Sequence, residues 1–136
     1  MSRPFKLEII TPTREFLEMT AEAVSASTPD GEITVLAGHA PMVAALSIGE
    51  LKCKEVGGVW RKAFHSEGFM EVRPDEVLIF AQACEWPEEI DIKRAESARE
   101  RALEKLRQKQ SIYEYQHTNI SLARAMTRLK LTKGRK

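Results

Sequence analysis

The hydrophobic pattern of this chain changes at Pro87, and that change constrains the fold more than any other feature of the sequence. Before Pro87, apolar residues come in short runs with the two-residue period of β-strands, and the runs end at turn residues. After Pro87, alanine and leucine recur at intervals of three and four residues, which is the spacing of one helix face. We therefore expect two domains, residues 1–86 and residues 87–136.

The first domain is expected to be a β-sandwich of about ten short strands. Phe5, Leu7 and Ile9 alternate with polar side chains, and turn residues such as Pro29-Asp30-Gly31 and Gly57-Gly58 separate the later runs. The predicted strands are 5–10, 15–20, 21–28, 33–36, 42–46, 50–56, 59–66, 68–72 and 76–85. Short strands with turns at this spacing are typical of a sandwich.

The second domain is expected to be an antiparallel hairpin of two helices. Asp91 is a suitable residue to start the first helix, and the break between the helices should fall within residues 110–119. Each helix should pack against the other through a narrow row of side chains, which we call its seam. The predicted seams are Ala95, Ala98, Ala102 and Leu106 on the first helix, and Leu122, Ala125, Met126 and Leu129 on the second. Such narrow seams bury little area, so the free energy of docking should be small. The sequence leaves open whether the hairpin stays docked or acts as an arm that detaches.

Charge is divided unevenly between the two domains. The whole chain has a net charge of +1, but residues 1–86 hold 13 acids and 8 bases, while residues 87–136 hold 7 acids and 13 bases. From Tyr115 onward there is no acid, and the bases are Arg124, Arg128, Lys130, Lys133, Arg135 and Lys136. This asymmetry predicts different partners for the two ends of the chain.

The sequence gives little support to catalysis. Cys53 and Cys84 are isolated, which favours buried thiols, and His39, His65 and His117 have no neighbours at metal-ligand spacing. No glycine-rich phosphate loop and no nucleophile elbow occurs. No signal-peptide pattern is visible, and no apolar run approaches the roughly 18 residues of a membrane span.

The segment from Gly31 to Gly49, GEITVLAGHAPMVAALSIG, joins two apolar strands through a tight glycine-proline connection. It resembles the corresponding segment of the epsilon-subunit family of bacterial F-type ATP synthases. Three more pieces match that family in the same order: ITPTR at residues 10–14, GFMEVRP at 68–74 and IDIKRA at 90–95. The resemblance covers essentially the whole chain.

The resemblance implies a non-catalytic rotor subunit that links the gamma subunit to the c-ring. Family positions that contact the rotor correspond to Thr11, Glu32, His39 and Ala44, with Glu32 toward the c-ring and the other three toward gamma. The implied location is the cytoplasmic face of the bacterial plasma membrane, as a peripheral part of the ATP synthase. No insertion into the membrane and no nucleic-acid partner are expected.

Asp91, Arg94 and Arg101 form a candidate binding set on the first helix. Arg101 lies two turns beyond Arg94, roughly 10 Å along the helix, so both guanidinium groups could hold a polyphosphate. The alternative is an ordinary helix with an N-cap and solvated arginines. The resemblance favours regulatory ATP binding. The residues at the matching family positions, which it implies take part in binding, are Glu85, Ile90, Asp91, Arg94, Ala95, Arg101 and Arg128. Trp86-Pro87 is bulkier and stiffer than the family pattern, which puts the reach of Glu85 in question, and the role of magnesium is open.

The basic second helix has two interpretations. It is either a solubilising tail or, as the resemblance implies, an arm that extends beside gamma and inhibits ATP hydrolysis. In the second case Arg124, Arg128 and Lys130 would contact an acidic stretch of the beta subunit, with the alpha subunit as a further candidate. The alternative function is a free-standing sandwich module whose basic helices grip an acidic protein or nucleic acid. Against that alternative, Tyr113 and Tyr115 are the only aromatic residues among the bases.

Overall fold

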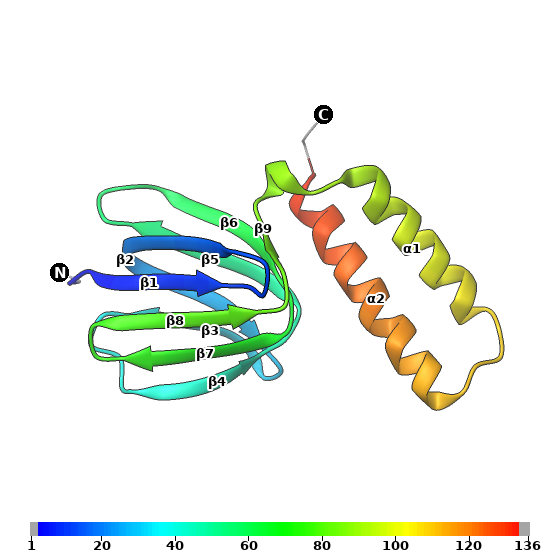
Figure 1. Cartoon of the computed structure of the whole chain (residues 1–136), viewed down its shortest axis with the longest axis horizontal. Coiled ribbons are helices and arrows are strands. Elements are labelled where there is room, and N and C mark those ends of the chain that lie inside the picture. Colours follow the sequence, from blue (N-terminus) through cyan, green and yellow to red (C-terminus); the bar gives the residue numbers. More distant parts are fainter. Residues whose placement is uncertain (1–2, 134–136) are drawn as a thin grey trace. The chain divides into compact units, whose positions relative to one another are not determined.

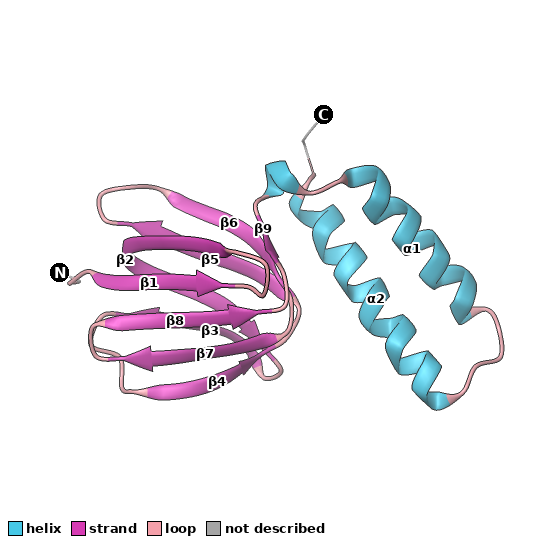
Figure 2. Cartoon of the chain, viewed as in Figure 1, coloured by secondary structure: helices cyan, strands magenta, loops and turns pink. Residues whose placement is uncertain are grey.

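The computed structural model describes residues 3–133. The chain divides into two compact units between Trp86 and Pro87. Strands make up the first unit and helices the second (Figures 1 and 2). The described part of the first unit has nine strands: β1 Phe5–Ile10, β2 Glu15–Thr28, β3 Gly31–Leu36, β4 Met42–Leu46, β5 Gly49–Glu55, β6 Trp60–His65, β7 Gly68–Arg73, β8 Glu76–Ala81 and β9 Cys84–Glu85.

The strands form a β-sandwich, as predicted, because the long strand β2 takes part in both layers. The hydrogen-bonded order is β4-β7-β8-β1-β2-β5-β6-β9, with β3 also paired to β2. The first half of β2 pairs with β1, and the second half pairs with β3 on one side and β5 on the other (Figure 1). Strand β8 lies between β7 and β1, so it is a central strand of its layer.

Two strand predictions were wrong in detail. Residues 15–20 and 21–28 are one strand, because its pairing with β5 shifts between Ala21 and Ala23 and lets the strand bend without ending. Residues 76–85 are two strands instead of one. The N–H of Ala83 donates to Ser66 Oγ at 2.7 Å instead of joining the sheet, so β8 ends at Ala81.

The sandwich core consists of side chains from the inner faces of both layers. Along β1, Phe5, Leu7 and Ile9 are buried while the intervening residues are half-buried or exposed, as the two-residue period predicts. Cys53 and Cys84 are free and buried, which confirms the prediction for them. Burial raises the pKa of the Cys53 thiol to about 11, so this thiol is unreactive at neutral pH.

His65 is a fully buried polar residue at the end of β6. Its Nε2 accepts the N–H of Ser27 at 3.1 Å, and its Nδ1 lies 3.1 Å from the carbonyl oxygen of Ser66. The proton of the neutral ring therefore sits on Nδ1, and a second proton on Nε2 would remove the acceptor of Ser27. Burial lowers the pKa of His65 below its ordinary value of 6.5, against a smaller opposite effect of Ser66.

This geometry predicts that acid destabilises the sandwich. Because the pKa of His65 is lower in the folded state than in the unfolded chain, its contribution is intact above pH 6.5. Below pH 6.5 the free energy of unfolding should fall by about 1.4 kcal/mol per pH unit, until the folded-state pKa is reached. Urea unfolding between pH 7.5 and 5 measures this slope. It should persist in His39→Gln and largely disappear in His65→Gln; an equal slope in both variants contradicts the assignment.

The second unit is a helical hairpin preceded by a short 3-10 turn, Pro87–Glu89. Helix α1 is Ile92–Leu106 and α2 is Ile112–Leu131, and the two pack antiparallel (Figure 1). Ala95, Ala102, Thr118 and Ala125 are the buried residues inside the helices. The predicted place of Met126 in the seam was wrong. Met126 is 50% exposed, because it follows the buried Ala125 by one residue and so points about 100° away from it.

The break between the helices overlaps the predicted window of 110–119 only at residues 110 and 111, since α2 begins at Ile112. Ser111 caps this helix: its Oγ accepts the N–H of Glu114 at 3.1 Å and donates to the carboxylate of Glu114 at 3.0 Å. This Ser-x-x-Glu capping pattern outweighs the weak helix propensity of the aromatic and β-branched residues that follow. The break itself is residues 107–111.

Candidate functional site

The predicted nucleotide-binding set begins at the first turn of α1. Asp91 is the N-cap, as predicted: its Oδ1 accepts the N–H of Arg94 at 3.0 Å, and its backbone is extended. Just before it, the N–H of Ile90 donates to the carbonyl oxygen of Pro87 at 3.2 Å. The capping role proposed as the alternative for Asp91 is therefore present. One of its carboxylate oxygens is already engaged by the helix.

Arg94 and Arg101 are both exposed on α1. They are seven residues apart, which places them on nearly the same side of the helix about 10 Å from each other. Arg107, which follows α1, differs from them because it forms an ion pair, with its Nη1 2.8 Å from Oε2 of Glu104. Two exposed guanidinium groups in line offer a series of paired N–H donors, the arrangement that suits phosphate oxygens.

A wide, open hollow of about 590 Å³ lies along α1. Lys93, Glu96, Ser97, Glu100 and Arg101 line it. Arg101 thus belongs to the hollow and Arg94 does not, and the two glutamates offset much of the positive charge. The charged residues that line the hollow, two bases and two acids, cancel, so the lining alone is a weak anion site.

The other predicted nucleotide residues differ in exposure. Ile90 and Ala95 are 1% and 4% exposed, so their side chains could shape the site only by packing. Arg128 is half-buried on α2, the partner helix of α1. Glu85 lies in β9, where it pairs with Phe64, and so belongs to the sandwich. The hairpin therefore contains all of the predicted set except Glu85.

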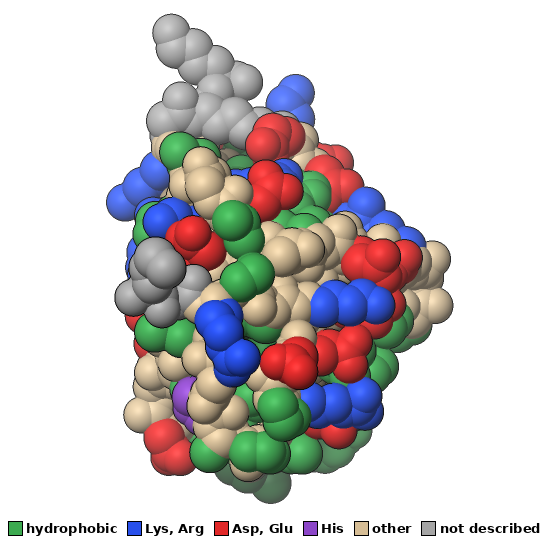
Figure 3. Space-filling model, turned by 90° about the vertical axis from the view of Figure 1, so that its left-hand side faces the viewer, with side chains coloured by type: hydrophobic (Ala, Val, Ile, Leu, Met, Phe, Trp, Pro, Cys, Tyr) green, Lys and Arg blue, Asp and Glu red, His purple; other side chains and the backbone are tan. Residues whose placement is uncertain are grey.

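The predicted inhibitory residues follow one another on α2. Arg124 and Arg128 are one helical turn apart and half-buried, and Lys130 is exposed. Arg135 and Lys136, which complete the basic run in the sequence, lie outside the described residues. On the face of the molecule drawn in Figure 3, acidic and basic side chains are interspersed. The last acid of α2 is Glu114, so the part of the helix after it carries basic but no acidic side chains.

The four predicted rotor-contact positions lie in different parts of the sandwich. Glu32 lies near the start of β3 and forms an ion pair with Lys52 at 3.3 Å, and His39 is half-buried in the loop after β3. Thr11 is 7% exposed, and its hydroxyl donates to the carbonyl oxygen of Arg14 at 3.0 Å. Ala44 packs against the core from β4.

An aromatic and arginine stack near the end of the sandwich was not foreseen. The rings of Phe16 and Trp86 lie 4.6 Å apart, the guanidinium of Arg61 covers Trp86 at 3.9 Å, and that of Arg14 covers Phe16 at 5.1 Å. The stack ties Trp86, the last residue of the sandwich, to β2 and β6. Only tertiary structure brings these residues together, so no local pattern in the sequence could indicate it.

Within residues 3–133, none of the helices combines the length and the apolar character needed to cross a membrane.

Two family descriptions match consecutive parts of the chain. Residues 4–87 match the ATP synthase delta/epsilon chain beta-sandwich domain, and residues 88–133 match the long alpha-helix domain of the same chain.

Curated relatives and solved structures agree with these matches. The chain is 48% identical over 132 residues to the ATP synthase epsilon chain of Caldanaerobacter subterraneus subsp. tengcongensis, covering 96% of this chain and 95% of that one. It is 46% identical to that of Ruminiclostridium cellulolyticum, covering 97% and 98%. A chain of the Euglena gracilis mitochondrial ATP synthase superposes with a TM-score of 0.80 at 27% identity, over 91% of this chain and 78% of that chain. This chain therefore belongs to the ATP synthase delta/epsilon chain family.

Proposed function

We propose that the sandwich links the gamma subunit to the c-ring in the rotor of a bacterial ATP synthase, where a chain of this family is a non-catalytic subunit of the central stalk. The observation that carries the proposal is the match of both family domains, in order, over residues 4–133. The relatives bear the name ATP synthase epsilon chain, and the Euglena assembly is described as containing F1 and the c-ring. The family match leaves a free-standing module that grips nucleic acid without support.

Co-purification tests the rotor role. Tagged full-length chain, expressed with gamma and the c-subunit of the same enzyme, should retain both on the affinity column. Glu32→Lys should weaken retention of the c-ring and leave gamma bound, since the exposed pair of Glu32 with Lys52 contributes little to folding. Failure of the wild-type chain to retain gamma would refute the proposal.

The helical hairpin is proposed to bind ATP as a regulatory ligand that it does not hydrolyse. Arg94 and Arg101 would hold the phosphates, Arg128 would contribute from α2, and Asp91 would accept a hydrogen bond from the ribose or base. Ile90 and Ala95 would pack beneath them, and Glu85 belongs to the proposed set through the family resemblance alone. A ligand held by both helices stabilises the closed hairpin over an extended arm by its difference in affinity for the two states. Whether magnesium takes part is left to the titration.

Isothermal titration of the full-length chain with ATP, with and without magnesium, checks this proposal. Arg94→Gln with Arg101→Gln should lower the affinity by at least tenfold, since each charged hydrogen bond contributes about 1.5 kcal/mol or more. Asp91→Ser separates ligand binding from helix capping, because serine is an equally good N-cap but lacks the carboxylate. Arg107→Gln is the matched control and should bind normally. Absence of saturable binding at millimolar ATP contradicts the proposal.

The second regulatory proposal concerns the basic residues of α2. Arg124, Arg128 and Lys130 would contact an acidic stretch of the beta subunit, or of alpha, when the arm extends and blocks ATP hydrolysis. The acid-free sequence after Glu114 supports this proposal. The chain would be a peripheral part of the ATP synthase, on the cytoplasmic face of the bacterial plasma membrane.

A further inference from the structure

The seam between α1 and α2 consists of small side chains and one polar side chain. Of the buried residues inside the two helices, Ala95, Ala102 and Ala125 are alanines, and Thr118 carries a hydroxyl. Alanine side chains bury little apolar area, so this seam holds the helices together weakly. A specific polar contact between the helices therefore has a large influence on whether the hairpin stays closed.

Gln110 makes such a contact from residues 107–111, which connect the helices at the closed end of the hairpin (Figure 1). Its Nε2 donates to the carbonyl oxygen of Lys105 at 2.6 Å, in the last turn of α1. Its Oε1 accepts the hydroxyl of Thr118 at 3.0 Å, on α2. Because a carbonyl oxygen can only accept, Lys105 fixes the orientation of the amide group. One half-buried side chain thus joins the two helices through two hydrogen bonds.

This bridge can be complete only in the closed hairpin. Its two ends are on different helices, so when α2 moves away from α1, Gln110 cannot keep both Lys105 and Thr118. The hydroxyl of Thr118 has a second acceptor within its own helix, the carbonyl oxygen of Glu114 at 2.8 Å. After opening, that hydroxyl can donate to Glu114 alone and is not left without a partner. The bridge is therefore a weak contact that can break and form again.

We propose that Gln110 and Thr118 form a latch, which sets the fraction of the hairpin that is open and thereby the strength of inhibition by the arm. The inhibitory consequence rests on the proposed function, whereas the latch itself is a property of the hairpin. The latch requires an amide, because one end must donate and the other must accept. A glutamate in place of Gln110 would lose the donor to Lys105 and bring a negative charge to the C-terminal end of α1, where it is unfavourable.

Hydrogen exchange of residues 122–131 in the full-length chain, measured by mass spectrometry, tests the latch. Helices in proteins owe most of their stability to tertiary packing, so the amides of α2 should exchange when α2 leaves α1. Gln110→Ala and Thr118→Val should each raise the exchange rate about threefold, the effect of losing a modest hydrogen bond, and Gln110→Glu should raise it more. Combining Gln110→Ala with Thr118→Val should add nothing, because either change already breaks the bridge. Independent contributions would multiply to about ninefold.

Matched controls remove an amide elsewhere in the hairpin. Gln108→Ala, exposed in the same connection, and Gln116→Ala, exposed on α2, should exchange like the wild type. Unchanged exchange in the Gln110 and Thr118 variants, or a ninefold effect of the double change, would overturn the latch. Equal helix content by circular dichroism would exclude unfolding of α2 as the cause of faster exchange.

ATP hydrolysis by the assembled enzyme separates the latch from the inhibitory arm. Gln110→Ala should lower hydrolysis by up to about threefold, since it raises the open fraction by that factor. Faster exchange together with lower hydrolysis supports both the latch and the arm. Faster exchange with unchanged hydrolysis would support the latch and refute the inhibitory arm of the proposed function.

Discussion

Replacing Gly68 with alanine is expected to destabilise the sandwich by about 3 kcal/mol or more, the upper range for overpacking. Gly68 is the first residue of β7 and pairs with Leu46 on one side and Ala81 on the other. A Cβ at this position would collide with the carbonyl oxygen of Phe80 and lie 2.8 Å from the Cα of Ala81. Both obstacles are backbone atoms of a central strand, so no side-chain rotation can relieve the contact.

Urea unfolding of the full-length chain, followed by circular dichroism in the β region, measures the loss. Gly58→Ala is the matched control: its Cβ would lie 3.3 Å from the Cβ and carbonyl oxygen of Glu55, in a surface turn that can shift. The control should change the free energy of unfolding by less than about 1 kcal/mol. Equal stability of the two variants would show that β7 and β8 separate easily, contrary to the pairing described.

The fold could be predicted where the decisive interactions are local. Gly31 and Gly57, read from the sequence as turn residues, have φ values of +123° and +70°, which glycine adopts readily. The continuity of β2 could not be predicted in the same way. Its bend depends on a shift in pairing with β5, a strand more than twenty residues later in the chain. The sequence around Ala21 contains no signal for that shift.

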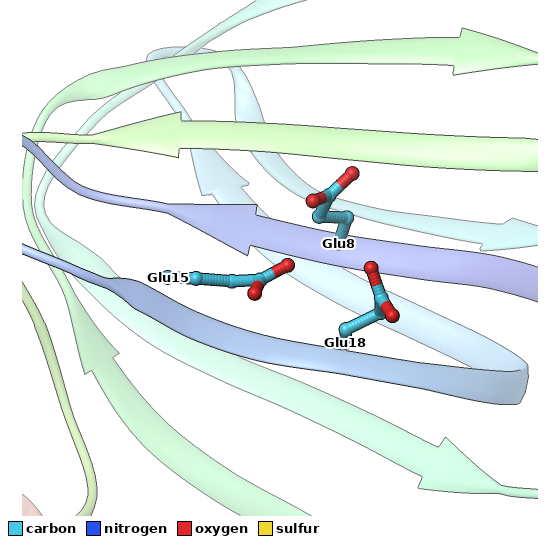
Figure 4. Close-up of side chains that lie close together, drawn as sticks. All are labelled: Glu8, Glu15 and Glu18. Carbon is cyan, nitrogen blue, oxygen red and sulfur yellow. The ribbon is translucent and has the colours of Figure 1, made fainter.

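In the candidate site, too, features set by neighbouring residues could be predicted and features set by strand pairing could not. The role of Asp91 as a helix cap was readable because the cap and its N–H donor, Arg94, are three residues apart. The close approach of Glu8, Glu15 and Glu18 (Figure 4) was not readable, since Glu8 and Glu18 become neighbours only when β1 and β2 pair. The repulsion between these carboxylates arises from the register in which β1 pairs with β2. Surfaces built across several strands therefore have to be found in the structure.

Stopping the chain after Trp86 is expected to raise ATP hydrolysis by the assembled enzyme, by about fivefold if the arm blocks roughly four enzymes in five. The sandwich should survive this truncation, because all of its buried core residues precede Pro87. Retaining Trp86 keeps its stack with Phe16 and Arg61. The rotor contacts would remain while the basic residues of α2 are removed.

The matched control keeps the arm and removes only its charge. Arg124→Gln, Arg128→Gln and Lys130→Gln together should reproduce much of the gain in hydrolysis, whereas Lys105→Gln with Lys109→Gln, exposed bases near the end of α1, should not. Hydrolysis that stays unchanged in the truncated enzyme, with gamma and the c-ring still attached, rules out an inhibitory arm. A gain on truncation without any effect of the charge variant would mean that α2 blocks through its exposed apolar side chains, such as Ile112 and Tyr113. The truncation and the charge variant thus separate the effect of the arm itself from the effect of its charge.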